Sequence, residues 1–264
     1  MARRATRRLL EGTGRTIQRN LADARSRNFP HNEETVTENL ILWAHQSSLT
    51  SIEVHAITKP KEAEFGYDFD LRLETRPGLF NSIVVQAKRE MLTNAYRVEH
   101  TVRGTTQMAL LESHASTTGS TAAYAFYNAS ILGGFVSSHC PCSMRARGAV
   151  SSDDRLIGCT VSPLADVKSV LVRDGACRFD NIHSRANTIP LRCLLCPLRM
   201  GDASGSLAPE GPTDTSPWAG ILAEAEPRTQ PEAVMERLST RDSWRTDYPS
   251  AYVPKYMVVI RSSQ

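Results

Sequence analysis

Hydrophobic and polar positions alternate in three short segments of the first third of the chain. Residues 52–57, 66–73 and 83–88 place apolar side chains at every second position over much of their length. This period of two is typical of β-strands, whose successive side chains point to opposite faces of a sheet. The third segment is the most apolar, so we expect it to lie near the middle of a sheet.

Segments on either side of these strands show the longer hydrophobic period that is typical of helices. Between residues 33 and 46, apolar side chains recur every three or four positions, which predicts one buried helix face. These side chains are Val36, Leu40, Trp43 and Ala44. Residues 105–114 repeat the pattern, and residues 121–127 are typical of a further strand. The order of helix, three strands, helix and strand predicts an α/β fold with a mixed central β-sheet flanked by helices.

The pattern weakens after residue 130, and this divides the chain. We expect a basic N-terminal arm over residues 1–29, a core domain over residues 30–130 and a cysteine-containing extension of that core over residues 131–200. Much of the segment 201–264 is rich in Gly, Ser, Pro, Thr and Glu, which predicts a loop-rich or partly disordered tail. An apolar run near its end could supply a final strand.

Positive charge is concentrated at the start of the chain. The net charge is +3, yet the first 28 residues hold eight arginines against only Glu11 and Asp23. A basic segment on a near-neutral body fits a polyanionic partner such as nucleic acid. A solvated helix and an organellar transit peptide are the alternatives for the same residues.

The composition and the lengths of the apolar runs indicate where in the cell we expect the protein. The chain is 41% hydrophobic and 22% charged, as in ordinary globular proteins. No apolar run approaches the roughly 20 residues that a membrane-spanning helix needs, and the first residues lack the apolar segment of a secretory signal. We therefore expect a soluble, cytoplasmic protein that does not bind membranes.

The segment from Asp68 to Lys88 holds the residues with the most informative chemistry. If Asp68 pairs with Gln86, each residue i faces residue 154 − i, and the turn falls at Pro77-Gly78, which is a typical turn sequence. Alternation then places the carboxylate, the amide and the Lys88 ammonium on one face. Burying a lysine is costly unless an acid lies beside it, so this face needs a carboxylate partner.

The order of these residues resembles that of a known enzyme superfamily. An acidic helix with Glu34 is followed by Phe-Gly-Tyr-Asp68 and then by Val-Val-Gln86-Ala-Lys88. This series is similar to the PD-(D/E)xK nuclease superfamily, in the Mrr-like restriction endonuclease variant where Gln replaces the second acid, and to a bacterial domain family of this type. The resemblance covers residues 30–130 and implies a restriction-endonuclease-like core.

The resemblance also implies roles for individual residues. The catalytic residues would be Glu34, Asp68, Gln86 and Lys88. The first three would bind Mg²⁺ or Mn²⁺ through oxygen atoms. Lys88 would position the attacking water and offset charge on the scissile phosphate. Glu38 is a second choice for Glu34, and Asp70 is a reserve ligand on the same strand face as Asp68.

Six cysteines lie in the second half of the chain. Cys193 and Cys196 have the spacing of a zinc knuckle, and Cys140 and Cys142 form a second pair. Four such thiolates could form a structural Zn²⁺ site. Reduced thiols in a hydrophobic core are the alternative, because two leucines separate the first pair, and disulfides are not expected in the cytosol.

Two classes of function stay open. The first is a metal-dependent endonuclease that hydrolyses DNA phosphodiester bonds, in a bacterial defence or restriction-type system as the resemblance implies. A homodimer would suit the cutting of both strands. The second is a catalytically inactive nuclease-like scaffold that binds nucleic acid or protein. The sequence contains no recognisable base-reading module, so a partner or a fused module could supply specificity.

Overall fold

The computed structural model describes residues 2–29, 31–47, 52–56, 66–76, 78–102, 104–130, 157–195, 218, 221–222, 228–229 and 256–261. Its helices are α1 (Ala2–Ser26), α2 (Glu33–Gln46), α4 (Gln107–Thr118), α7 (Leu164–Asp174) and α8 (Phe179–His183), with a 3-10 helix η1 (Leu191–Leu195). Its strands are β1 (Ile52–Ala56), β2 (Phe69–Arg76), β3 (Leu79–Arg89), β4 (Thr101–Val102), β5 (Thr105–Thr106), β6 (Thr121–Tyr127), β7 (Cys159–Pro163), β8 (Ile189–Pro190), β9 (Arg228–Thr229) and β10 (Tyr256–Ile260). None of the described helices is both long and apolar enough to cross a membrane.

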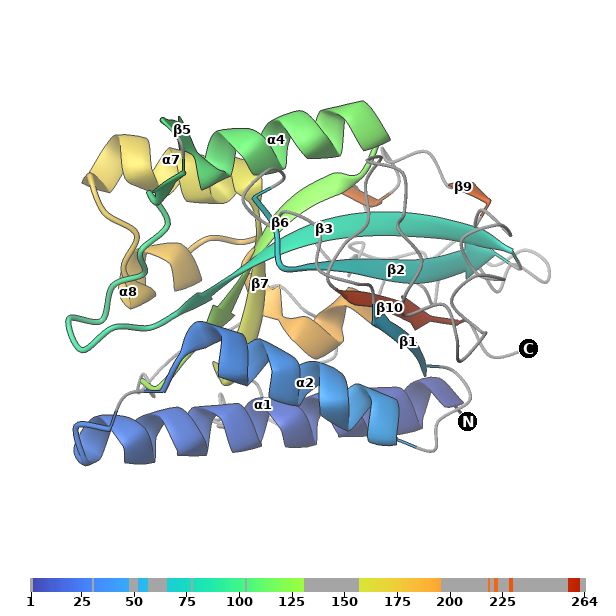
Figure 1. Ribbon diagram of the computed structural model, residues 1–264, viewed down its shortest axis with the longest axis horizontal. Coiled ribbons are helices and arrows are strands. Elements are labelled where there is room, and N and C mark those ends of the chain that lie inside the picture. Colours follow the sequence, from blue (N-terminus) through green and yellow to red (C-terminus); the bar gives the residue numbers. More distant parts are fainter. Residues whose placement is uncertain are drawn as a thin grey trace, which may run out of the picture.

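Most of the described strands form one mixed sheet in the order β1-β10-β2-β3-β6-β7-β8, with β9 paired to β3. The pairs β10–β2 and β3–β6 are parallel, whereas the other neighbours in this sheet are antiparallel. Helices α4 and α7 cover one face of the sheet, and α1 and α2 cover the other (Figure 1). The expected α/β fold with a mixed central sheet flanked by helices is therefore confirmed.

Side chains on β3 alternate between two hydrophobic cores. Ile83, Val85 and Ala87 pack in the core toward α1 and α2, whereas Val84 packs in the core toward α4, α7 and α8. Residues 83–88 are all buried, because helices cover both faces of the sheet here. Each fully buried valine or isoleucine contributes about 1.5–3 kcal/mol relative to an exposed one. The face of Val84 must also accommodate the amide and the ammonium group at positions 86 and 88.

The β2–β3 hairpin pairs in the register expected from the sequence. Phe69 faces Val85 and Glu74 faces Phe80, so that paired positions sum to 154 along this stretch. A bulge after Glu74 shifts the register before the turn. Gly78 has a φ of +75°, and its amide donates to the Glu74 carboxylate at 3.0 Å. This left-handed backbone favours glycine, which explains the glycine of the turn.

The residues expected as a basic arm form the long helix α1, which packs on the sheet. Ile17 and Leu21 are buried in the core toward α1 and α2. Residue 158 lies so close to this helix that a Cβ atom on Gly158 would come within 1.7 Å of the Gly14 carbonyl oxygen. Arginines such as Arg8 are exposed on its outer surface. The segment is therefore an amphipathic helix that belongs to the packed fold.

The end of the chain returns to the interior of the sheet. Strand β10, which the sequence suggests as a final strand, lies between β1 and β2. Its residues alternate between faces: Val258 and Ile260 join the core toward α1 and α2, and Met257 and Val259 pack with Phe80. The last described strand thus connects β1 to the hairpin that carries the candidate site.

Candidate active site

The β2–β3 hairpin carries the polar residues of the site near the ends of its strands. Asp68 precedes β2 and extends its pairing, because its backbone N–H donates to the Val85 carbonyl at 2.8 Å. Gln86 and Lys88 lie near the end of β3, on the face that Val84 turns toward α4. Both are buried, with 2% and 5% of their surfaces exposed. Strand pairing therefore brings the carboxylate and the amide together.

Asp68 and Gln86 are in direct contact. Nε2 of Gln86 donates to Asp68 Oδ2 at 2.7 Å, and the Ala87 backbone N–H donates to the same oxygen at 2.6 Å. Two donors on one oxygen favour the ionised carboxylate and fix its orientation. The other amide atom, Gln86 Oε1, is buried and has no hydrogen-bond partner among the described residues. Such an orphaned acceptor costs about 1–3 kcal/mol, so a ligand that binds it is favoured.

Lys88 is held by partners from two helices. Its Nζ lies 3.3 Å from Oε1 of Glu33 and 3.2 Å from Oε1 of Gln107, the first residues of α2 and α4. The second Glu33 oxygen, Oε2, accepts the backbone N–H of Arg89 at 2.9 Å. Glu33 thus compensates the charge of the buried ammonium and fixes the start of α2 to the end of β3.

The acidic residue of α2 that hydrogen-bonds to β3 is Glu33, whereas Glu34 lies on another face of the helix. Successive helix residues are turned by about 100°, so Glu33 lies above the buried Val36 and Thr37, whereas Glu34 lies above Glu38. Glu34 and Glu38 are both exposed, and the structure does not bring them to Asp68. The apolar stripe that begins at Val36 is a usable signal, because a residue three positions earlier lies on the same face.

Asp70, the reserve ligand on β2, is fully buried and has other partners. Its Oδ2 accepts from Arg72 Nε at 3.1 Å, and its Oδ1 accepts from Ser82 Oγ at 2.7 Å. Within the described part of the chain, no hydrogen bond joins Asp70 to Gln86 or Lys88. Asp70 therefore stabilises the hairpin through its contacts with Arg72 and Ser82.

Tyr124 lies beside the site on the neighbouring strand. It pairs with Gln86 in the parallel β3–β6 ladder, and its hydroxyl is buried without a hydrogen-bond partner among the described residues. Burial, and then the nearby Cys177, Asp68 and Glu33 groups, raise the pKa of the Tyr124 hydroxyl. The hydroxyl therefore stays protonated and can act only through hydrogen bonds. Its place depends on a distant strand pairing, so the sequence alone gives no sign of it.

The donor set suits a hard divalent cation. Asp68 offers a carboxylate, and the orphaned amide oxygen belongs to the Gln86 side chain in contact with it. Mg²⁺ and Mn²⁺ prefer such oxygen ligands, and water completes their coordination. Among the described residues, no group of three or more His, Cys, Asp or Glu side chains could hold a metal ion. A cation at Asp68 would therefore depend on the Gln86 oxygen and on backbone and water oxygens.

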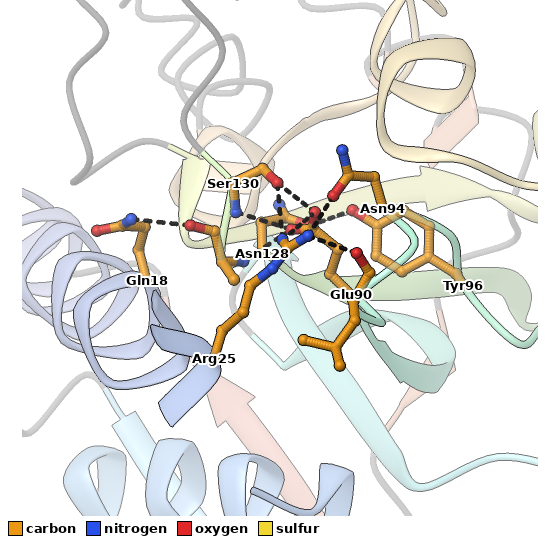
Figure 2. A network of polar contacts seen from close by, with 9 residues as sticks. Gln18, Arg25, Glu90, Asn94, Tyr96, Asn128 and Ser130 are labelled. Atoms are coloured by element: carbon orange, nitrogen blue, oxygen red, sulfur yellow. Dashed lines mark hydrogen bonds and ion pairs between the residues drawn. The ribbon is translucent and has the colours of Figure 1, made fainter. Parts of the chain in front are cut away.

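A second polar network fixes the end of β3 to α1 (Figure 2). Glu90, which is 3% exposed, accepts from the backbone N–H groups of Ala129 and Ser130 at 2.8 Å each, and from Arg25 Nη1 at 3.2 Å. Arg25 also donates to the Leu92 carbonyl oxygen at 2.7 Å and to a neighbouring asparagine side chain. These bonds compensate both charges, so the network is structural and positions the last turn of α1.

Three of the four cysteines expected to bind zinc lie outside the described residues, namely Cys140, Cys142 and Cys196. Cys193 is fully buried on η1 among apolar side chains. Cys159 and Cys177 are also buried, and burial raises the pKa of each thiol to about 12. The described thiols thus fill the hydrophobic cores, and the zinc site stays a prediction.

Comparison with protein families gives a match along nearly the whole chain. The model described as "Family of unknown function (DUF6615)" matches residues 6–263. The match includes the site hairpin, both helices that hold Lys88, and β10 at the far end of the chain. A search of curated proteins found no significant match. Because the family model spans almost every residue, the chain belongs to the DUF6615 family.

Proposed function

We propose that this protein is a metal-dependent nuclease that hydrolyses phosphodiester bonds in DNA. The observation that carries the proposal is the contact of Gln86 with Asp68, which leaves a buried amide oxygen that has no partner among the described residues. Lys88 follows two residues along the same face of β3 and is almost completely buried. The order of acid, glutamine and lysine resembles that of the Gln-x-Lys nucleases, and a mixed sheet flanked by helices is compatible with their core.

Asp68 and the Gln86 amide oxygen would hold Mg²⁺ or Mn²⁺, with the Ala87 carbonyl as a further oxygen. The bound cation would supply positive charge that stabilises the phosphate during hydrolysis. The hydrogen bond from the Ala87 N–H keeps the Asp68 carboxylate in place for this role. Glu33 is no ligand in this proposal, because both of its oxygens accept hydrogen bonds from β3.

Lys88 supplies a positive charge with a restricted position. Its contacts with Glu33 and Gln107 prevent the side chain from extending into water. In these surroundings of low polarity, a hydrogen bond from the ammonium to a phosphate oxygen or to the attacking water is stronger than at the surface. Glu33 acts through Lys88 and is therefore a positioning residue.

A nuclease-like scaffold without catalysis is the second candidate. The observation that favours it is that Glu33 already uses both carboxylate oxygens, on Lys88 and on the Arg89 backbone. This leaves Asp68 as the carboxylate in contact with Gln86. A site with one available carboxylate has less negative charge than a three-acid site and binds cations more weakly. A scaffold of this kind would bind DNA or protein without cutting.

Cleavage of supercoiled plasmid and of single-stranded DNA in Mg²⁺ or Mn²⁺ tests the proposal. We expect the wild type to cut only with metal, and Asp68→Asn and Lys88→Met each to lose at least about 100-fold in rate, as when a group that stabilises transition-state charge is removed. Lys168→Met on α7 is the matched control, because this lysine is 39% exposed and lies outside the site. It should cut at the wild-type rate.

Metal binding separates the two candidates. Calorimetric titration of the wild type with Mg²⁺ should give a divalent site that Asp68→Asn removes. A folded wild type that neither binds the cation nor cuts DNA would contradict the nuclease and favour the scaffold. Cutting that persists in both Asp68→Asn and Lys88→Met would mean that another part of the chain performs the reaction.

A further inference from the structure

A cavity of about 400 Å³ lies at the end of β3. Residues 89–93 form one wall, and the other is formed by residues from the end of α1 and before α2, namely Leu21, Ala24, Arg25, Asn28, Phe29 and His31. This volume lies within the range of about 300–1,000 Å³ that is typical of small-molecule sites. The cavity is separate from the contacts of Asp68 and Gln86, and neither of these residues lines it.

The cavity adjoins the candidate active site through β3. Lys88 and Arg89 are consecutive on this strand, so their side chains leave it on opposite faces. Lys88 contacts Gln107 in the site, whereas Arg89 lines the cavity. Glu33 contacts both residues through its two carboxylate oxygens. The cavity and the site therefore lie at the same end of β3 on opposite faces of the strand, and a DNA strand that reaches both must pass around this end.

Exposed apolar side chains gather at this cavity. Among the described residues, the large exposed hydrophobic side chains are Phe29, Leu42, Leu92 and Val172. Two of the four line the cavity: Phe29 is 66% exposed and Leu92 is 62% exposed. Leu21 and Met91 add apolar surface to the same walls. An exposed aromatic ring at an apolar cavity is a stacking surface for a nucleobase.

The backbone at the end of α1 holds Phe29 in place. Asn28 adopts a φ of +52°, which ends the helix, and the Phe29 N–H donates to the Ala24 carbonyl at 2.8 Å. Arg25, one turn earlier, is fixed by its ion pair with Glu90 (Figure 2). The aromatic ring is thus presented by an ordered backbone, which lowers the entropic cost of binding a ligand.

The charged residues of the cavity favour an anion. Arg25 and Glu90 compensate each other, and the Glu90 side chain is fully buried. Arg89 adds a further positive charge to the lining. His31 adds a ring that can donate a hydrogen bond. The lining therefore has an excess of positive charge, which suits a phosphate group.

We propose that this cavity binds one nucleotide of the DNA strand next to the scissile phosphodiester, with its base on Phe29 and a phosphate near Arg89. The proposal rests on the proposed nuclease function. A base reaches the ring only when it is unpaired, so the cavity selects single-stranded or frayed DNA. An apolar peptide would fill the same walls but would leave the Arg89 charge without a partner.

Binding can be measured without cleavage. A short fluorescein-labelled single-stranded oligodeoxynucleotide is titrated with the full chain in EDTA, and anisotropy gives the dissociation constant. We expect Phe29→Ala to weaken binding about tenfold, as for one lost stacking contact. Val172→Ala is the matched control, because it removes an exposed apolar side chain on α7, 90% exposed, and should leave binding unchanged. An iodouracil-substituted oligonucleotide should crosslink to Phe29 under light.

The outcomes of these experiments distinguish a failure of the cavity proposal from a failure of the nuclease proposal. Unchanged affinity in Phe29→Ala, while Lys88→Met still abolishes cleavage, would overturn the cavity proposal alone. A wild type that neither binds the oligonucleotide nor cuts would overturn both proposals. Binding of a labelled apolar peptide that Phe29→Ala removes, with oligonucleotide affinity unchanged, would assign the cavity to a protein partner and overturn the nucleotide proposal.

Discussion

Lys88 and Glu33 form an ion pair where the sheet meets solvent. The lysine side chain is 7% exposed and the glutamate side chain is 33% exposed. Glu33 can still reach water if its partner is lost, whereas the Lys88 ammonium cannot. Gln107 supplies a dipole to the same ammonium but no charge, so it cannot replace the carboxylate. The pair therefore affects both the stability of the hairpin end and the position of the ammonium.

Glu33→Gln should lower the free energy of unfolding by about 2 kcal/mol, because it leaves a buried ammonium without a countercharge, and partial exposure of Glu33 makes the effect smaller than for a fully buried pair. Glu34→Gln is the matched control. Its side chain is exposed, so the change should stay below about 0.5 kcal/mol. Urea denaturation measures both values, and DNA cleavage should fall in Glu33→Gln only.

A double variant separates the contribution of the Lys88–Glu33 ion pair to stability from the other contributions of Glu33. In a Lys88→Met background, Glu33→Gln should cost about 1–2 kcal/mol less than in the wild type, because the charge that it compensates is gone. Equal costs in the two backgrounds would contradict the pairing. Equal loss of cleavage in Glu33→Gln and Glu34→Gln would contradict the positioning role.

The same residues show what the sequence can and cannot predict at this scale. Asp68, Gln86 and Lys88 follow from alternation along two strands and from the turn between them, which are local features. The partners Glu33 and Gln107 are 55 and 19 residues away from Lys88. The helical period indicates that Glu33 lies on the buried face of α2, but it does not determine that α2 and α4 pack at the end of β3.

For helices and strands too, the sequence predicts local features but not contacts between distant segments. The β2–β3 register could be predicted because a short turn connects the strands. The position of β10 could not, since Met257 pairs with Asp70 across most of the chain. The sequence predicts an arm where α1 lies, because the buried positions of this helix, such as Ile17 and Leu21, are few among many arginines. Its contribution to the core becomes evident only when the sheet is in place.

A buried polar cluster around His183 connects α8 to the sheet. Nδ1 donates to the Phe179 carbonyl at 2.7 Å, so Nε2 accepts from the Thr160 hydroxyl at 2.8 Å. Asn128 Nδ2 lies 3.3 Å from the same Nε2, and Asn128 Oδ1 accepts the Tyr96 hydroxyl (Figure 2). These contacts require a neutral imidazole. Burial lowers the pKa of His183 to about 4, although the hydrogen bond to Phe179 acts in the opposite direction.

The fold should therefore lose stability as the pH falls from about 6.5 to about 4. In this window the unfolded chain binds a proton at His183 and the folded chain does not, which amounts to about 3 kcal/mol. Urea denaturation across this range should show a smaller loss in His183→Gln. His45→Gln, at an exposed position on α2, should keep the wild-type dependence. An identical pH dependence in wild type and His183→Gln would contradict the assignment.

On the scale of the whole molecule, basic surface and the cavity lie along one helix. Helix α1 has 25 residues and is about 37 Å long at 1.5 Å per residue. Its apolar positions face the sheet, whereas Arg8 and Arg19 are exposed on its outer surface. Its last turn lines the cavity next to Lys88. A DNA backbone bound along the arginines of α1 would therefore be held close to the cavity.

Arg8→Gln combined with Arg19→Gln should weaken DNA binding at low salt and lower the slope of log K against log salt concentration by about 1–2, because each phosphate contact releases counterions. Lys168→Gln, on the opposite face of the sheet, should leave the slope unchanged. Deleting α1 is no substitute, since Ile17 and Leu21 belong to the core and the shortened chain would lose its fold. Cleavage at saturating protein should persist in the double variant, because neither arginine contacts the site. An unchanged salt slope in the double variant would contradict the role of α1. If Lys168→Gln lowered the slope instead, the DNA would bind at the face covered by α7.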